Sequence, residues 1–545
     1  MSRRTWTCLV MVIALMGASA AQASSRPTEV PTLPAIDAKA LATLRQVAVL
    51  HHGRFKPFDS YARETLRLIT GSSRLRGDDP MATVLGVVAS PSDWTEAKII
   101  LVPFVPLRQQ LGLEERTRYV SYAELISTKK LMRMLPAIVA KQQREEKLTV
   151  LDNETMDLYD RFVAFSGLMQ QRLVLVPPAD PEAREWRPVL QTPLKATWAA
   201  LVSAFGRGDA AQVMTLSRRF AQETRQVDPA AYPAPWRLRL EVFYNRIAPF
   251  AVARVLYALA AALFLAGILR TRSKLSQPGV GVFLAAALTH AAGILMRVVI
   301  GGRPPVSNFF ETMLWLPFVA VMLALVFERV YRVGFFGFSA SIVSAVMLLL
   351  ADYVPLDSSI SPVVAVLHSN LWLTVHVLTI VASYGALALA AVLAHVYSGF
   401  YVARRPASTL KALGTFLYRA LQIGVVLLAG GIMLGAVWAN ASWGRYWGWD
   451  PKETWALITL LWFLAVLHGR FAGWLHDLSV ALSTISGFFL LLMTYYGVSF
   501  YLVGLHSYAG GHAKPLPPLL ISYLIAEVIF LVMVGLMAAR RRRAA

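Results

Sequence analysis

The residues of this sequence that could do chemistry gather around one tryptophan-rich segment, residues 443–455. Indole rings offer large apolar faces with one hydrogen-bond donor each, and glycine lets the backbone approach a flat ligand closely. The segment therefore favours a surface for a planar apolar molecule. The alternative is an aromatic belt, since tryptophan is common at membrane surfaces. Four tryptophans are interleaved with two glycines here, at Trp443, Trp447, Trp449 and Trp455.

One histidine precedes this segment and another follows it, His376 and His506. Two neutral imidazoles that face each other can ligate the iron of a haem from both sides. A lone histidine in an apolar helix is more often a hydrogen-bonding packing residue. Two at one membrane depth beside an aromatic surface instead indicate a shared ligand.

His468 and His290 form a second candidate pair, deeper in apolar sequence. Ionisable side chains inside a membrane are costly, and they often mark functional sites. This pair could hold a haem within the bilayer on its way outward. Polar packing between helices is the alternative role for each of them.

Charged residues close to the tryptophans could serve the same ligand. Arg303, Arg445 and Lys452 are candidate partners for its acidic groups. Asp450 and Glu453 could orient the loop or contact a substrate, although capping and salt bridging explain them equally well. The single cysteine, Cys8, lies in residues 1–23, which we expect to be a signal peptide; if that segment is removed, thiol chemistry must come from a substrate or partner.

The elements that must position these residues are membrane-spanning helices. Of the 545 residues 56% are hydrophobic and only 16% are charged, which fits a multi-spanning membrane protein better than a soluble domain. We expect an all-α polytopic protein with about nine transmembrane helices in residues 248–545, and the tryptophan-rich loop at 440–455. The spans are expected near 249–269, 277–300, 312–328, 335–351, 371–398, 416–438, 455–475, 478–503 and 518–539.

The part before the first span has a different composition. Residues 1–23 read as a signal peptide, with Arg3 and Arg4 before a short apolar run; an uncleaved anchor helix is the alternative. Residues 24–247 contain no run that is apolar enough to span a membrane, and they predict a mainly helical extracytoplasmic domain. This domain is long enough for a core of its own.

The distribution of basic residues predicts the orientation. The net charge of +21 is that of a membrane protein with cytoplasmic basic anchors, and we expect no nucleic-acid binding. Nine spans after an exported domain leave the C-terminus inside, in agreement with the run Arg540–Arg543. Basic residues in the inner connections are Arg270, Arg272, Lys274, Arg329, Arg332, Arg404, Arg405, Lys411, Arg419 and Arg470, against Arg303, Arg445, Lys452 and Lys514 outside.

Together these motifs resemble a known family. The tryptophan-rich segment is similar to the WWD motif of haem-handling proteins, and three further features are similar to the CcsA (ResC) type in particular. These are His376 in Trp372–His376, His506 in Gly504–Tyr508 with His468 in the span between, and the stretch Gly302–Glu311, which reads Gly-Arg-Pro-Pro-Val-Ser-Asn-Phe-Phe-Glu. The resemblance covers about residues 237–540. The segment His52–Glu64 resembles an extension of some larger bacterial relatives.

The resemblance implies cytochrome c biogenesis by System II: haem delivery and covalent attachment of haem to apocytochrome c. Haem b would be both substrate and bound ligand. His376 and His506 correspond to ligands of an external haem, and His468 to a ligand of an intramembrane haem. The second intramembrane ligand would be His290 or would come from a separate CcsB protein.

The resemblance also implies partners and a location. The partners are a CcsB/ResB-like membrane protein, apocytochrome c with its Cys-x-x-Cys-His segment, a thiol-reducing thioredoxin-like protein, and membrane lipid. The location is the bacterial inner (cytoplasmic) membrane, with the WWD loop facing the periplasm. Three other functions stay open: a haem exporter or other haem-handling transporter without ligation activity, a redox cytochrome b, and an assembly scaffold.

Overall fold

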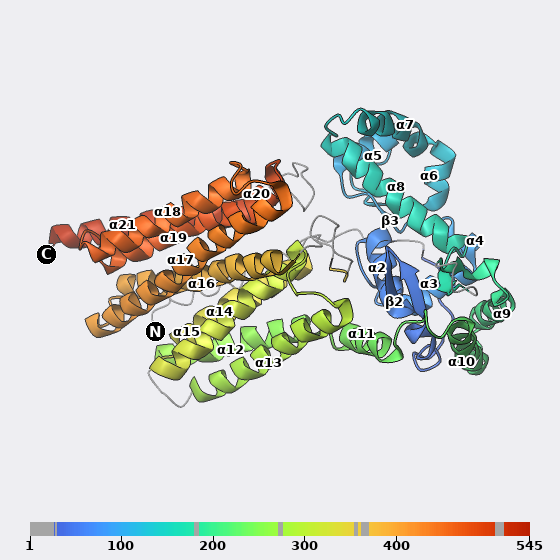
Figure 1. The fold of residues 1–545 in the computed structure, drawn as a ribbon, viewed down its shortest axis with the longest axis horizontal. Coiled ribbons are helices and arrows are strands. Elements are labelled where there is room, and N and C mark those ends of the chain that lie inside the picture. Colours follow the sequence, from blue (N-terminus) through green and yellow to red (C-terminus); the bar gives the residue numbers. More distant parts are fainter. Residues whose placement is uncertain are drawn as a thin grey trace. The chain divides into compact units, whose positions relative to one another are not determined.

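The computed structural model describes residue 27 and residues 30–178, 185–270, 276–353, 358–360, 370–506 and 517–544. The expected signal peptide lies outside these residues. The chain divides into two compact units, Met1–Val242 and Phe243–Ala545, here called the N-terminal unit and the membrane unit. Figure 1 shows both units.

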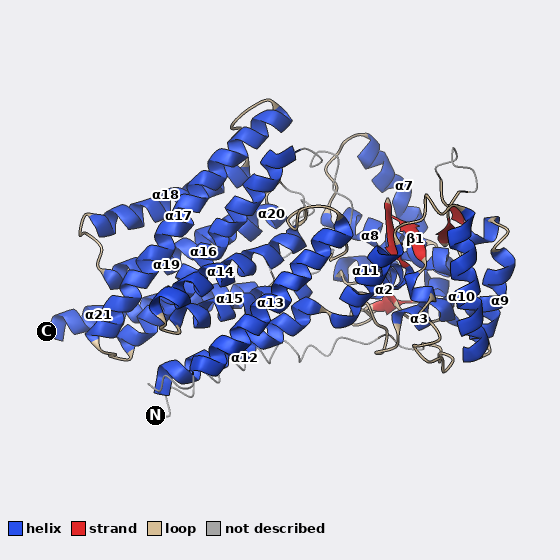
Figure 2. Cartoon of the chain, turned by 60° about the horizontal axis from the view of Figure 1, so that its bottom comes forward, coloured by secondary structure: helices blue, strands red, loops and turns tan. Residues whose placement is uncertain are grey.

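The N-terminal unit is mainly helical, as expected. Its strands form two-stranded antiparallel sheets, β1 with β2, β3 with β4 and β5 with β6, drawn in red in Figure 2. The helices are α2 (Phe58–Thr70), α3 (Pro80–Ala89), α4 (Pro91–Trp94), α5 (Val105–Leu111), α6 (Tyr122–Thr128), α7 (Lys130–Gln143), α8 (Val150–Met169), α9 (Lys195–Gly206), α10 (Ala210–Val227) and the first part of α11 (Pro235–Ile247), which crosses the boundary after Val242. The strands are β1 (Ala48–His51), β2 (Arg54–Pro57), β3 (Ile100–Leu101), β4 (Tyr119–Val120), β5 (Val174–Val176) and β6 (Arg187–Pro188), with 3-10 turns η2 (Leu44–Gln46) and η3 (Val189–Gln191).

The segment His52–Glu64 builds an ion-pair network within this unit. Glu241 on α11 accepts two hydrogen bonds from Arg54, at 2.8 and 2.7 Å, and one from Ser60 at 2.6 Å. Asp59 accepts from Arg45 and Arg63, at 2.7 Å each. A bidentate arginine–carboxylate pair of low exposure is strong and geometrically specific. The segment therefore holds α11 against the first hairpin and α2.

In the membrane unit, nine helices among the described residues are long and apolar enough to cross a membrane, which confirms the expected number. The last expected span but one is a helix interrupted by a π-helical turn, η6. The elements are α12 (Pro249–Arg270), α13 (Ser276–Gly301), α14 (Phe309–Tyr331), α15 (Phe335–Tyr353), α16 (Asn370–Val402), α17 (Ala407–Trp443), α18 (Pro451–Phe471), α19 (Asp477–Leu492) with η6 (Met493–Gly497) and α20 (Val498–Tyr501), and α21 (Pro518–Ala544).

The loop expected at 440–455 is shorter than the tryptophan pattern indicated. Trp443 is the last residue of α17, and α18 begins at Pro451 because Asp450 caps it. Asp450 and Glu453 form a reciprocal capping box, and proline is well tolerated in a first helical turn. The tryptophan-rich segment is therefore a tight connection between two long helices.

Small residues let the helices that carry the site pack closely. A Cβ on Gly385 of α16 would come within 2.5 Å of the Leu316 carbonyl oxygen on α14. A Cβ on Gly424 of α17 would lie 2.7 Å from Leu387 of α16. Glycine allows such backbone approach, and dispersion forces then supply the attraction between helices in lipid. These contacts join α14, α16 and α17 in one bundle, seen side by side in Figures 1 and 2.

We expect Glu241→Ala to destabilise the N-terminal unit by about 3–5 kcal/mol, because it removes the carboxylate that pairs with the poorly exposed Arg54. Pulse proteolysis over a urea series on the full-length protein measures this change. The matched control is Glu223→Ala, which removes a partner of the exposed Arg219 and should cost about 1 kcal/mol or less. Equal losses of stability in the two variants would contradict the role of Glu241 in holding α11 against the first hairpin and α2.

Candidate functional site

His376, on α16, is held by the neighbouring helix α17. Its Nδ1 lies 2.8 Å from the Gly431 carbonyl oxygen. A carbonyl only accepts, so Nδ1 carries the proton and Nε2 keeps the lone pair that a metal needs. One turn further along α17, a Cβ on Gly435 would lie 2.6 Å from Cε1 of this imidazole. The two glycines therefore supply both the hydrogen-bond acceptor and the room for the ring.

His506, which follows α20, is held by a carboxylate. Its Nδ1 donates to Asp450 Oδ1 at 2.8 Å, so this ring too has Nε2 as its ligating nitrogen when it is neutral. A carboxylate behind an imidazole fixes the tautomer and orientation of the ring and increases its basicity as a ligand. Both expected histidines thus have the same protonation pattern.

Asp450 joins three pieces of chain. It caps α18 through the Lys452 amide at 2.8 Å and accepts the Leu505 amide at 2.7 Å, besides His506. Burial by itself would raise the pKa of Asp450. The hydrogen bond and charge of His506 and the two backbone N–H donors outweigh burial and hold the pKa below its ordinary value. Asp450 is therefore an ionised anchor for the residue that follows α20.

The two histidines meet around one indole, Trp438 near the end of α17. The Trp438 ring is nearly parallel to His376, at 9° with centroids 6.3 Å apart, and lies 6.1 Å from His506. Trp443 packs on Trp438 at 4.7 Å and on His506 at 5.2 Å. The structure thus brings His376, His506 and Trp443 together, as the sequence predicted, and adds Trp438, which sequence reasoning missed.

The other tryptophans of the segment lie differently. Trp447 and Trp449 pack edge-on against each other, with centroids 5.7 Å apart. Trp449 is 70% exposed and has a φ of 56°, an unusual conformation for a bulky residue. Trp455 lies within α18, beyond the capping turn. Trp447 and Trp449 therefore lie at the outer edge of the connection and Trp455 lies in a helix. These three do not line the site beside the histidines as Trp443 does.

Two of the three cations expected to face a ligand make hydrogen bonds within the protein. Lys452 Nζ donates to the Tyr495 carbonyl at 3.2 Å and to Ser499 Oγ at 2.9 Å, and so ties α18 to the π turn and α20. Arg303 donates to Glu311 Oε2 at 2.6 Å, beside a second pair from Arg297 at 3.0 Å. Arg445 is exposed in the loop.

The second histidine pair is not brought together. His290, on α13, is fully buried; Nε2 donates to the Leu314 carbonyl at 3.0 Å, and Nδ1 lies 3.3 Å from the Tyr257 hydroxyl. Both nitrogens thus have protein partners, as the packing alternative expects. His468 lies on a different helix, α18, where its ring is exposed and Nδ1 donates to the Leu464 carbonyl at 2.8 Å.

One intramembrane ionisable pair escaped the sequence analysis. His395 on α16 lies 2.9 Å from Glu527 on α21, and the His395 ring stacks on Phe530 with centroids 5.3 Å apart. A glutamate inside the apolar run of α21 was the available signal, because such a residue needs a partner in lipid. The pair attaches α21 to α16.

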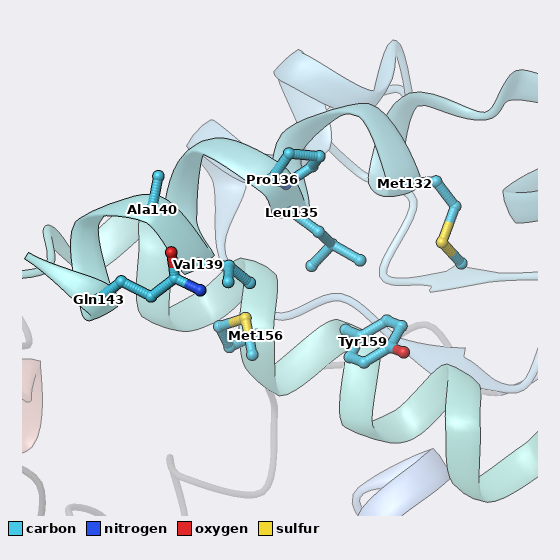
Figure 3. A pocket seen from close by; sticks show the side chains of 8 residues that line it. All are labelled: Met132, Leu135, Pro136, Val139, Ala140, Gln143, Met156 and Tyr159. Atoms are coloured by element: carbon cyan, nitrogen blue, oxygen red, sulfur yellow. The ribbon is translucent and has the colours of Figure 1, made fainter.

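The N-terminal unit has an open, mainly apolar hollow of about 470 Å³ between α7 and α8. Figure 3 shows its lining from the two helices, with Met132 and Leu135 on α7 and Met156 and Tyr159 on α8. None of the residues singled out in the sequence lines it. The described residues also contain no cluster of three or more His, Cys, Asp or Glu side chains that could hold a bare metal ion.

Fold and site together define a polytopic membrane protein whose paired histidines lie among indoles at the ends of its helices. Residues 306–506 match the family model described as cytochrome C assembly protein. The chain is 33% identical over 249 residues to the cytochrome c biogenesis protein CcsA of Prochlorococcus marinus, covering 40% of this chain and 79% of that protein. It is 34% identical over 260 residues to the CcsA of Guillardia theta, covering 42% and 85%. The chain belongs to the CcsA family of cytochrome c biogenesis proteins.

A longer relative extends the similarity. The chain is 31% identical to Protein NrfI of Wolinella succinogenes over 497 residues, which is 85% of this chain and 54% of that protein. The chain thus spans about half the length of NrfI. The membrane unit is too short to account for this alignment, so the similarity reaches well into the N-terminal unit. This similarity extends beyond residues 237–540, over which the chain resembles the CcsA type, and it agrees with the resemblance of His52–Glu64 to an extension of larger bacterial relatives.

We expect Asp450→Asn to loosen the segment that carries His506, since an amide cannot accept all three hydrogen bonds that the carboxylate accepts. Hydrogen exchange measured by mass spectrometry should become faster at Leu505–His506 and in the first turn of α18. Asp477→Asn is the control, because Asp477 pairs with Arg470 at the start of α19. Unchanged exchange in Asp450→Asn would contradict the anchor role.

Proposed function

We propose that this protein holds haem b at the outer end of its membrane bundle, between His376 and His506, and presents it for covalent attachment to apocytochrome c. One observation carries the proposal: each imidazole donates Nδ1–H to a protein acceptor, Gly431 or Asp450, and this tautomer makes Nε2 the nitrogen that carries the lone pair. Neutral imidazoles oriented in this way are the usual axial ligands of haem iron. The indoles of Trp438 and Trp443 beside them suit a flat apolar ring system.

Each side chain then has a defined part. His376 and His506 hold the iron, Asp450 keeps His506 in one tautomer, and Lys452 fixes the start of α18 against the turn that leads to His506. Trp447 and Trp449 form the outward edge, where Trp449 and Arg445 are exposed to an incoming polypeptide. The protein contributes positioning and electrostatics, while haem and thiol supply the reactivity.

The attachment chemistry is an addition. Each cysteine S–H of the substrate's Cys-x-x-Cys-His segment adds across a haem vinyl group, so that sulfur bonds to one vinyl carbon and hydrogen to the other. Nothing leaves and no oxidant is consumed. The thiols must be reduced, which gives a role to a thioredoxin-like partner. The histidine of the substrate segment replaces one protein histidine on the iron, and the product can then depart.

The proposed location is the bacterial inner membrane, with the N-terminal unit and the WWD loop on the periplasmic side. The basic run Arg540–Arg543 at the end of α21 supports a cytoplasmic C-terminus. With nine spanning helices, the opposite end of the bundle carries the loop between α17 and α18 and the residues after α20. Apocytochrome c would meet the haem on that side.

For the intramembrane haem we propose His468 with a ligand from a CcsB-like partner. His468 is exposed on α18, whereas His290 uses both ring nitrogens within the bundle. An imidazole on the outside of a bundle suits a ligand shared with a second membrane protein. Haem would pass from this site to the outer pair.

Haem export without attachment is the second candidate function, because the same histidine pair would serve it. Attachment and export can be distinguished by co-expressing the protein with an apocytochrome c, with and without a CcsB partner, in cells that lack their own synthase. Covalent holocytochrome supports attachment. Haem that is bound to the protein and released outside, with no thioether product, supports export and contradicts our proposal.

In the same cells, His376→Ala and His506→Ala should each lower holocytochrome yield by roughly tenfold or more, as expected when a metal site loses a ligand. The purified variants should lose the low-spin bis-imidazole spectrum of the wild type, and added imidazole should restore part of it. A wild-type spectrum in both variants would contradict the assignment of these ligands.

Two glycines of α17 offer a matched test of the His376 site. Gly435→Ala places a Cβ 2.6 Å from the imidazole, whereas a Cβ on Gly430 meets nothing within 4 Å. Overpacking of about 1–3 kcal/mol should weaken haem binding by about tenfold in Gly435→Ala. Gly430→Ala should bind haem as the wild type does. Equal affinities in the two variants, measured by haem titration, would place the haem elsewhere.

A further inference from the structure

Trp438 carries an unsatisfied hydrogen-bond donor at the centre of the site. The side chain is 1% exposed, and its indole Nε1 has no acceptor among the described residues. Two other indoles of the membrane unit are satisfied: Trp315 donates to the Leu378 carbonyl at 3.2 Å and Trp462 to the Ser483 carbonyl at 2.9 Å. Within the described part of the chain, Trp438 is the only tryptophan whose indole nitrogen is buried without a partner.

A second unsatisfied group lies one turn away. Ser442 Oγ is buried and has no hydrogen-bond partner among the described residues. Residues four apart lie on the same face of a helix, so the Trp438 and Ser442 donors share one side of α17 near its end. Trp438 places that side beside His376 and His506.

A buried donor without an acceptor costs the full desolvation free energy of its N–H or O–H group. Native proteins therefore rarely contain one unless a bound molecule supplies the acceptor. The missing acceptor must reach the space beside the two imidazoles. Two of the cations considered as partners for the ligand's acidic groups already donate within the protein, Arg303 to Glu311 and Lys452 to Tyr495 and Ser499, and the third, Arg445, is exposed in the loop. The buried donors without a partner beside the histidines, Trp438 Nε1 and Ser442 Oγ, are neutral.

We infer that Trp438 Nε1–H and Ser442 Oγ–H donate to one propionate carboxylate of the haem bound by His376 and His506. This inference rests on the proposed function. The four pyrrole nitrogens bind iron and the methyl and vinyl groups are apolar, so the propionates hold the only acceptors at the rim of a haem. A carboxylate has two oxygens and can accept from both donors.

This contact sets the orientation of the porphyrin in its plane. The propionates occupy one edge of haem and the vinyl groups lie on the other pyrroles. A propionate anchored at the end of α17 therefore leaves the vinyl groups directed away from that anchor. Attachment requires the vinyl groups to meet the substrate thiols, so Trp438 and Ser442 act as positioning residues for the reaction.

The test compares iron mesoporphyrin with its dimethyl ester on the full-length protein. Both lack vinyl groups, so only equilibrium binding is measured, by titration of the bis-imidazole absorbance. The wild type should prefer the free acid over the ester. Trp438→Phe keeps an aromatic ring but removes the donor, and should reduce that preference by about tenfold, or about 1.4 kcal/mol. Ser442→Ala should reduce it in the same direction, and Trp462→Phe, whose indole donates to Ser483, should leave it unchanged.

The ratio of the two affinities separates hydrogen bonding from packing. Equal weakening of acid and ester in Trp438→Phe, or an unchanged ratio in both Trp438→Phe and Ser442→Ala, would overturn the inference while leaving haem binding by the histidines intact. Failure of the wild type to bind either porphyrin with a bis-imidazole spectrum would instead overturn the proposed function.

Discussion

The arrangement of the site depends on one carboxylate, that of Asp450. It caps the first turn of α18, accepts the Leu505 amide, and orients the His506 imidazole. A Cβ on Gly504 would collide with the same carboxylate, so the chain after α20 approaches it as closely as glycine allows. A group that accepts three hydrogen bonds in one place couples the start of one helix to the end of another. The position of one histidine is thereby set by the residue that caps a helix. The three hydrogen bonds are strongest while Asp450 is ionised, which its lowered pKa favours.

The other histidine depends on a different kind of contact, the close approach of α16 and α17. Glycines at the interface bring the Gly431 carbonyl within hydrogen-bond distance of His376 and leave space at Gly435 for its ring. In lipid, where apolar burial gives helices little reason to associate, such packing supplies most of the attraction. The two halves of the site are thus stabilised independently, one by electrostatics at a helix end and one by backbone packing. Trp438, on α17, touches both.

The N-terminal unit uses its charges in another way. Arg54, Ser60 and Glu241 join the first hairpin, α2 and α11 through hydrogen bonds of 2.6–2.8 Å. These residues account for the charged segment His52–Glu64 as a structural element of the unit. Its aromatic and aliphatic core is separate from the core of the membrane unit. Similarity to NrfI over 85% of the chain shows that the two units also occur together in a larger relative.

The sequence alone determined the class of fold, the nine spanning helices and the residues His376, His506 and Trp443 that meet in the site, because apolar runs and clustered chemistry are local properties. Only the tertiary structure decided which candidates find one another. His290 is as suggestive in sequence as His376, but its two nitrogens are satisfied by Leu314 and Tyr257. Arg303 and Lys452 are suggestive cations in the sequence, yet Arg303 donates to Glu311 and Lys452 donates to Tyr495 in the π turn. Trp438, Ser442 and the His395–Glu527 pair belong to no motif. His395 is explained by Glu527, a partner far along the chain. Trp438 and Ser442 stand out because their buried polar atoms have no partner among the described residues.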